Sequence, residues 1–232
     1  MQLSGVFLLV YLLYLCSACS SLEEENAMPS PLFQNYAPLY PDKVRSFRTD
    51  TLFFDPQGTG ILRDSQSGWI EEQIVDTFTD GEGHLMYQWL RQQGKVQDSL
   101  PGSGQYSVYL EGIVEQSLER TQGNLRFKML VFPPRADLDW DGHLYFDDRV
   151  VVEVKGEPIQ LYKDWTYRYA GVHESMEING VTYDSVLTLH AGMQNLLEYR
   201  FLKEQYALGQ GLIYREWLAL NTQHIDAELP WE

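Results

Sequence analysis

The sequence predicts a mainly β protein: a single antiparallel sheet, curled or folded into a sandwich or half-barrel, with at most one helix. Three observations predict this fold. Apolar and polar residues alternate with a period of two over several segments, Phe, Trp and Tyr make up 13% of the chain, and short turn-forming pieces separate the segments. Such alternation turns one face of each strand toward a core.

The expected strands follow one another with meander connections, as the short intervals between them indicate. They cover Arg45–Phe54, Trp69–Phe78, Leu85–Leu90, Tyr106–Val114, Leu125–Phe132, Leu144–Val154, Trp165–Ile178, Thr182–His190 and Leu212–Leu220. Asn179-Gly180 is the strongest hairpin signal, because a type I′ turn needs positive φ at both central residues.

The segment Gln194–Leu208 is the candidate for the one helix. It is rich in good helix formers, and Leu197, Phe201 and Leu208 could form a helical stripe. The same segment can be a strand with Leu197, Tyr199 and Phe201 on one face, turned by Gly209-Gln210-Gly211 into the last strand. We favour the strand.

The N-terminus predicts export. Val6–Leu15 is an apolar run of the length of a signal-peptide core, which is short for a membrane span. It is followed by Ser17-Ala18-Cys19, which resembles a bacterial lipobox. We therefore expect a signal peptide over residues 1–18 and an acylated Cys19 that attaches the chain to a lipid bilayer. An ordinary cleaved signal with an incidental cysteine is the alternative.

Residues 19–43 read as a tether and residues 44–232 as one β domain. The tether contains Glu23-Glu24-Glu25 and four prolines, which stiffen a chain and give it little to bury. Acids so close to Cys19 look like the export tag of surface lipoproteins in the Bacteroidota. This predicts a cell-envelope location, with the outer membrane or the cell surface favoured.

The charge balance limits the partners. With 33 acidic and 17 basic residues the formal net charge is −16, so nucleic acid and anionic lipid surfaces repel the chain. We expect no nucleic-acid partner. Cations and basic proteins remain compatible with this charge.

Three pieces of the body carry a family resemblance: Lys128–Pro134, a strand ending at prolines; the turn Trp140-Asp141-Gly142; and the glycine-containing hairpin Glu204–Glu216. In this order they resemble a set of uncharacterised extracytoplasmic lipoproteins of the Bacteroidota. The resemblance implies an antiparallel β domain and brings no catalytic residues.

The sharpest local signal is a calcium-loop spacing. Asp137, Asp139, Asp141 and Asp148 occupy oxygen-donating positions, and His143 would contribute its carbonyl. Ca²⁺ would be the one candidate cofactor. The alternative is a solvated acidic turn, which Pro133-Pro134 favours by excluding an entering helix.

The sequence contains no recognisable catalytic constellation. Its five histidines show no zinc-binding spacing, and there is no Gly-x-Ser-x-Gly element. Its tryptophans could form the core or line a sugar or lipid groove; they are Trp69, Trp89, Trp140, Trp165, Trp217 and Trp231.

The expected function is therefore a non-catalytic binding or envelope-structural module for a protein, glycan or hydrophobic ligand. Two alternatives stay open. One is an extracytoplasmic hydrolase whose residues are dispersed in the sequence, and the other is a Ca²⁺-stabilised β module.

Overall fold

The computed structural model describes residues 33–57, 60–96, 104–136, 138–154 and 157–221. The predicted signal peptide, Cys19 and the first part of the predicted tether lie outside the described residues, as does Asp137. Within them, no helix has the length and apolarity needed to cross a membrane.

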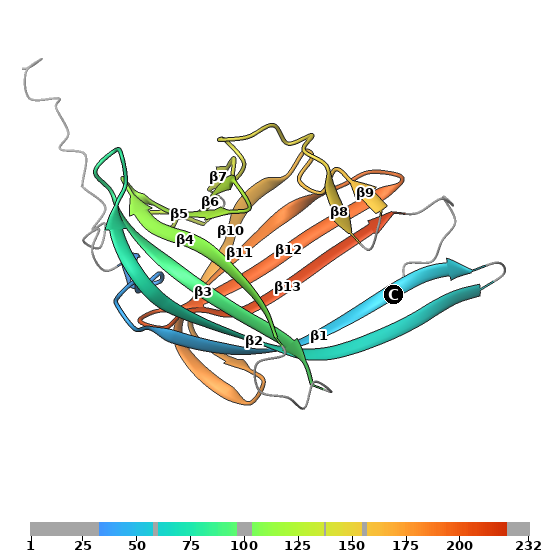
Figure 1. Ribbon diagram of the computed structural model, residues 1–232, viewed down its shortest axis with the longest axis horizontal. Coiled ribbons are helices and arrows are strands. Elements are labelled where there is room, and N and C mark those ends of the chain that lie inside the picture. Colours follow the sequence, from blue (N-terminus) through green and yellow to red (C-terminus); the bar gives the residue numbers. More distant parts are fainter. Residues whose placement is uncertain (1–32, 58–59, 97–103, 137, 155–156, 222–232) are drawn as a thin grey trace, which may run out of the picture.

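The first sheet is a six-stranded antiparallel meander in which each strand pairs with the next in the chain. Its strands are β1 (Val44–Gln57), β2 (Gly60–Thr79), β3 (Leu85–Lys95), β4 (Gln105–Val114), β5 (Ser117–Gln122) and β6 (Leu125–Val131). Figure 1 shows that this sheet curls strongly, so that its concave face turns toward the second sheet.

The second sheet has five strands in the order β13-β12-β11-β10-β7. They are β7 (Asp139–Trp140), β10 (Thr166–Ile178), β11 (Val181–Gln194), β12 (Glu198–Ala207) and β13 (Gly211–Asn221), and β8 (Val152–Val154) pairs with β9 (Glu157–Ile159) in a separate hairpin. The mainly β, curled fold predicted from the sequence is thus confirmed.

Two long hairpins extend beyond their sheets (Figure 1). Strand β3 pairs with β2 only over Gly68–Thr79, so the far part of the β1–β2 hairpin is a two-stranded arm. The β10–β11 hairpin turns at Asn179 and Gly180, whose φ angles of 51° and 79° confirm the predicted turn.

The core lies between the two sheets. Leu130 of β6 and Leu187 and Leu189 of β11 are fully buried, and Tyr169 of β10 is 1% exposed. The hydroxyl of Tyr169 donates to the carbonyl of Val131 at 2.6 Å and accepts from its amide at 2.8 Å, which links β10 to the end of β6.

The segment after β6 joins the sheets along one side. The amide of Lys128 donates to the carbonyl of Gly142 at 2.9 Å, and the indole N–H of Trp140 donates to the carbonyl of Lys128 at 2.9 Å. A Cβ at Gly142 would overlap the ring of Tyr167, which explains the glycine. The first two pieces that carry the family resemblance therefore lie side by side at this junction.

The structure corrects parts of the sequence prediction. Gln194–Leu208 contains strand β12, as favoured, but Leu144–Val154 was wrong as one long strand: residues 144–149 form turns and a bend before the short β8. Strand β5 was missed, because its consecutive charged residues Glu119 and Arg120, both buried, interrupt the usual apolar pattern.

The folded domain also begins before residue 44. A helical turn at residues 33–37 packs against the core, with Tyr36 and Ala37 buried, and Lys43 is 5% exposed. The amide of Gly209 donates to the carbonyl of Asn35 at 2.7 Å. Residues 33–43, which the sequence assigned to the tether, are therefore part of the domain.

Candidate functional site

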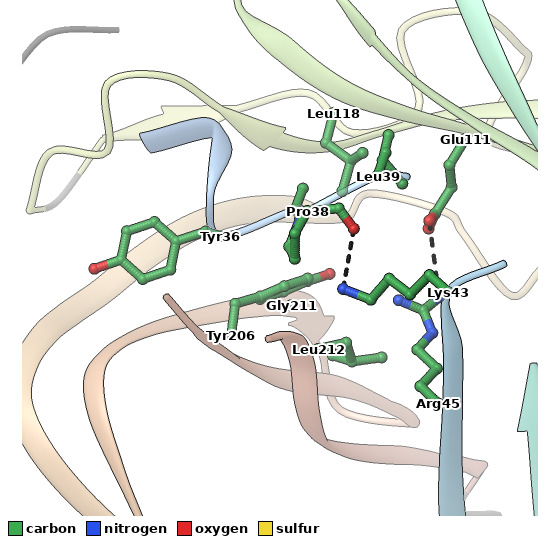
Figure 2. A pocket seen from close by; sticks show the side chains of 11 residues that line it. Tyr36, Pro38, Leu39, Lys43, Arg45, Glu111, Leu118, Tyr206, Gly211 and Leu212 are labelled. Carbon is green, nitrogen blue, oxygen red and sulfur yellow. Dashed lines mark hydrogen bonds and ion pairs between the residues drawn. The ribbon is translucent and has the colours of Figure 1, made fainter. Parts of the chain in front are cut away.

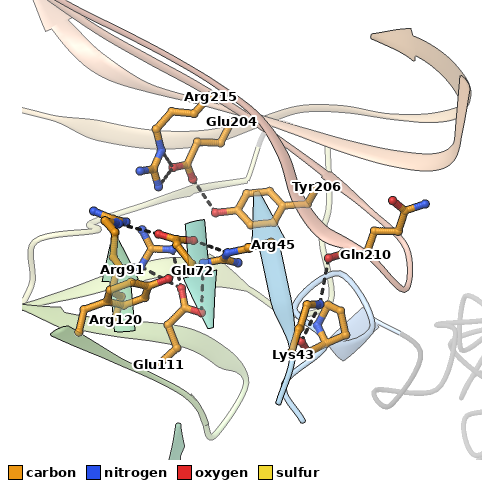
Figure 3. Close-up of polar contacts among 12 residues, drawn as sticks. Lys43, Arg45, Glu72, Arg91, Glu111, Arg120, Glu204, Tyr206, Gln210 and Arg215 are labelled. Atoms are coloured by element: carbon orange, nitrogen blue, oxygen red, sulfur yellow. Dashed lines mark hydrogen bonds and ion pairs between the residues drawn. The ribbon is translucent and has the colours of Figure 1, made fainter. Parts of the chain in front are cut away.

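Charged side chains occupy the centre of the molecule between the two sheets. We call this set the interior ion-pair network (Figure 3). Its members are Arg45, Glu72, Arg91, Glu111, Arg120, Glu204 and Arg215, and Lys43 lies beside them. They belong to β1, β2, β3, β4, β5, β12 and β13, apart from Lys43, which directly precedes β1.

Glu72 bridges the first three strands. It is 2% exposed, and its carboxylate accepts from Arg45 and from Nε of Arg91, the latter at 2.6 Å. Burial by itself raises the pKa of Glu72, but the nearby positive charges of Arg45, Arg91 and Arg120 outweigh it and lower the pKa to about 2. Glu72 is therefore ionised at neutral pH.

Glu111 continues the network toward β5. Its carboxylate accepts from Nε of Arg120 at 2.8 Å, and Nη2 of Arg45 lies 3.8 Å away. Arg45 also donates to the Tyr109 hydroxyl at 2.7 Å, and its guanidinium lies 4.1 Å from the ring centre of Trp89. Rings and carboxylates thus hold the arginines from both sides.

Glu204 carries the network into the second sheet. It is fully buried and accepts from the Tyr206 hydroxyl and from Nε of Arg215, both at 2.6 Å. Burial alone raises the pKa of Glu204, but the charges of Arg215 and Arg120 lower it by more, so the net shift of the pKa is downward. All three residues of this triad lie in the hairpin Glu204–Glu216 that carries the family resemblance.

Lys43 lies beside the network and a small cavity (Figure 2). Its ammonium group donates to the carbonyls of Pro38 and Gln210, each at 3.0 Å. Burial and the charge of Arg45 lower its pKa to about 8, partly offset by Glu111. The cavity measures about 10 Å³, which is room for one water molecule.

The interior can therefore cross-link the sheets, but among the described residues the cavity beside its charges is too small for an organic ligand. Its carboxylates with shifted pKa values, Glu72 and Glu204, are held ionised by arginines. Removing one partner of such a pair leaves a buried charge without its counterion, which lowers the free energy of unfolding.

A larger and open space lies outside the core, between two turns. We call it the loop basin; it measures about 480 Å³. Its lining residues are Asp141, His143, Leu144, Phe146, Asp147, Asp148, Arg149, Tyr162 and Trp165. The turns belong to the connection between β7 and β8 and to the connection between β9 and β10.

His143 forms the buried side of the basin. It is 3% exposed, its Nε2 lies 3.3 Å from the Tyr167 hydroxyl, and the rings of Phe146, Tyr162 and Trp165 lie 5.1, 5.0 and 5.8 Å from it, centre to centre. Burial lowers the pKa of His143 to about 4, although nearby acids oppose this shift. The imidazole is therefore neutral at pH 7.

Three carboxylates line the basin, and each makes a different local contact. Asp141 accepts from the amide of His143 at 2.8 Å, and Asp148 accepts from the amide of Asp164 at 3.1 Å. Asp147 accepts from Nη2 of Arg149 at 2.8 Å. A carboxylate has about four acceptor positions, so each keeps capacity for further donors.

The predicted calcium ligands are only partly brought together. Asp141, His143 and Asp148 line the basin, whereas both oxygens of Asp139 accept from Arg168, at 2.5 and 2.7 Å. The carbonyl of His143 accepts from the amide of Phe146 at 3.1 Å. Asp137 lies outside the described residues, and the Ca²⁺ site stays a prediction.

Local sequence patterns indicate the loop and, separately, Trp165 as a candidate groove residue, but neither their meeting in one basin nor the interior network. Tyr162 and Trp165 enter the basin from a turn about twenty residues away, which no local pattern indicates. For the network a signal existed: Glu111, Arg120 and Glu204 stand at positions where a strand would ordinarily carry apolar residues.

No family model matches the chain, and no curated protein or solved structure is significantly similar to it. What the protein binds or does must therefore be inferred from the geometry of the interior network and the loop basin.

Proposed function

We propose that the chain is a lipid-anchored, non-catalytic module of the cell envelope that binds a saccharide in the loop basin. The observation that carries the proposal is the basin itself, which combines an aromatic side with a carboxylate rim in a space of about 480 Å³. Small-molecule sites in proteins have this size and this mixture of groups.

The lining favours a polar ligand that also has apolar faces. Asp141, Asp147 and Asp148 can accept hydrogen bonds from hydroxyl groups, while Phe146 and Tyr162 can contact the C–H faces of a sugar ring. A purely hydrophobic ligand would remove water from these carboxylates without replacing its hydrogen bonds, which costs several kcal/mol.

Trp165 gives additional support. It lines the basin and is 7% exposed, and its indole N–H has no hydrogen-bond partner among the described residues. A buried donor left unpaired costs on the order of 1–3 kcal/mol. A sugar oxygen could supply the acceptor after a small side-chain shift.

Binding has more support than hydrolysis. Hydrolysis by general-acid catalysis needs a group that still holds a transferable proton near neutral pH. Burial lowers the pKa of His143 to about 4, and hydrogen bonds from Arg149 lower that of Asp147 to about 2. Neither group can donate a proton at pH 7.

The anchor rests on the sequence. The apolar run, the small residues before Cys19 and the resemblance to Bacteroidota lipoproteins support acylation at Cys19. Labelling with a fatty-acid probe tests this part: the label must be lost in Cys19→Ser and kept in the unaltered chain.

Saccharide binding is tested with two matched leucine variants. Leu144 lines the basin and is 60% exposed, whereas Leu196 is 79% exposed in the turn before β12. Because both side chains are mostly in solvent, Leu144→Arg and Leu196→Arg should each change the free energy of unfolding by less than about 0.5 kcal/mol.

Calorimetric titration with a panel of soluble oligosaccharides should give binding to the unaltered chain and to Leu196→Arg. Leu144→Arg should not bind, because its longer, charged side chain enters the basin. Equal binding by both variants would show that the saccharide does not bind in the basin. If the unaltered chain bound no member of the panel, the proposal that its ligand is a saccharide would be overturned.

A further inference from the structure

The turn between β2 and β3 brings three metal-ligating atoms together, far from the basin in sequence. Nδ1 of His84 lies 3.3 Å from Oδ2 of Asp80 and 3.6 Å from Oε2 of Glu82. All three ligand atoms lie within 4.8 Å of one another, and no other group of this kind exists among the residues that the structure describes.

These separations fit a zinc-type coordination shell. Zinc binds nitrogen and carboxylate oxygen at roughly 2.0–2.2 Å, so two ligands of a tetrahedral site are about 3.3 Å apart. A mixed set of one imidazole nitrogen and two carboxylates suits zinc-like ions better than Ca²⁺ or Mg²⁺, which prefer oxygen alone.

The backbone holds two of the three ligands in place. Oδ1 of Asp80 accepts from the amides of Glu82 and His84, at 2.9 and 2.8 Å, and the amide of Asp80 donates to the carbonyl of His84 at 2.9 Å. Gly83 has a φ of 90°, which only glycine adopts readily. Hydrogen bonds within the turn, including one between Nδ1 of His84 and Oδ2 of Asp80, thus keep the ligand atoms close together.

Arg126 is the competing cation, and it has a nearer partner. Its Nη1 lies 3.9 Å from Oε2 of Glu82, but its Nε donates to Oε2 of Glu119 at 2.5 Å. Glu82, with a side chain 66% exposed, can therefore turn toward a metal without leaving Arg126 unpaired.

We propose that Asp80, Glu82 and His84 bind a divalent zinc-like ion, with the remaining coordination positions open to water or to a group from another molecule. The proposal is independent of the loop basin. Histidine spacing in the sequence does not indicate this site, because its three ligands alternate along one turn and include a single histidine.

The test is calorimetric titration of the full chain with Zn²⁺, followed by Co²⁺ absorption spectra. We expect one tight equivalent of Zn²⁺ and visible Co²⁺ bands that indicate four-coordinate nitrogen and oxygen ligation. His84→Asn should weaken Zn²⁺ binding by more than about tenfold, since losing even an outer-shell partner costs that much.

Two further variants complete the test. Glu82→Gln alters a mostly exposed side chain and should also weaken binding, whereas His173→Asn replaces an exposed histidine on β10 and should leave binding unchanged. Absence of a tight Zn²⁺ equivalent, or equal affinity in His84→Asn and His173→Asn, would show that the turn is only hydrogen-bonded and would overturn the proposal.

Discussion

The interior ion-pair network and the loop basin both combine carboxylates, a guanidinium and aromatic rings, yet they differ in solvent access and in space. Glu72 and Glu111 are each 2% exposed and held by arginines, and Glu111 lines a cavity of about 10 Å³. Asp141 and Asp147 are exposed beside a basin of about 480 Å³.

This difference separates what holds the fold from what can meet a ligand. Charges inside the sheets are satisfied by one another, so their replacement should affect stability. Charges on the basin rim keep free acceptor positions, so their replacement should affect binding.

The largest effect should come from Glu72→Gln. The substitution leaves Arg45 and Arg91 buried without their carboxylate, and breaking a buried pair in this way costs roughly 3–5 kcal/mol. The free energy of unfolding, measured by urea denaturation, should fall by that amount.

The matched control for Glu72→Gln is Asp50→Asn. Asp50 pairs with Arg48 on the same first hairpin, but their side chains are 63% and 77% exposed, so the loss should stay below about 1 kcal/mol. An equal loss of unfolding free energy in the two variants would mean that the interior network stabilises the fold no more than an exposed ion pair does.

The second effect concerns His143 and pH. Burial lowers its pKa from 6.5 to about 4 in the folded chain. Between pH 6.5 and 4 the imidazole of His143 is protonated in the unfolded chain but stays neutral in the folded chain. The stability that His143 contributes is therefore complete above pH 6.5 and is lost as the pH falls toward 4, by roughly 3 kcal/mol.

His143→Phe removes this titration and keeps an aromatic ring among Phe146, Tyr162 and Trp165. Its unfolding free energy should depend less steeply on pH than that of the unaltered chain over the same window. If the free energy of unfolding had the same pH dependence in His143→Phe and in the unaltered chain, this would contradict the burial of a neutral imidazole at His143.

The smallest effect on stability should come from Asp147→Asn on the basin rim. The pair of Asp147 with Arg149 is 59% and 72% exposed, so the free energy of unfolding should change by less than about 0.5 kcal/mol. Saccharide affinity should nevertheless drop, because one carboxylate acceptor is lost. If Asp147→Asn lowered the free energy of unfolding but left saccharide affinity unchanged, Asp147 would stabilise the fold and would not bind the ligand.

The sequence predicted the fold well where local chemistry decides it. Period-two alternation and the pair Asn179-Gly180 depend on neighbouring residues alone, and both predictions were confirmed. The prediction of a strand over Leu144–Val154 was wrong because its apolar residues suit a strand, whereas hydrogen bonds that nearby amides donate to the carboxylates of Asp141 and Asp147 favour turns.

The candidate sites could be predicted only in part for the same reason. Asp141, His143 and Asp148 were found because they share one loop, but Trp165 joins them through the fold. The interior network pairs residues as distant as Arg45 and Glu111, and such a pair forms only once the strands are in register.

The most direct test of the separation follows the tryptophan indole N–H signals by NMR during titration with an oligosaccharide. Trp165 lines the basin, whereas Trp89 is fully buried beside Arg45. We predict that the Trp165 signal shifts in a saturable manner while the Trp89 signal stays in place. A saturable shift of Trp89 with Trp165 unmoved would contradict the account, because the ligand would then be bound at the interior network.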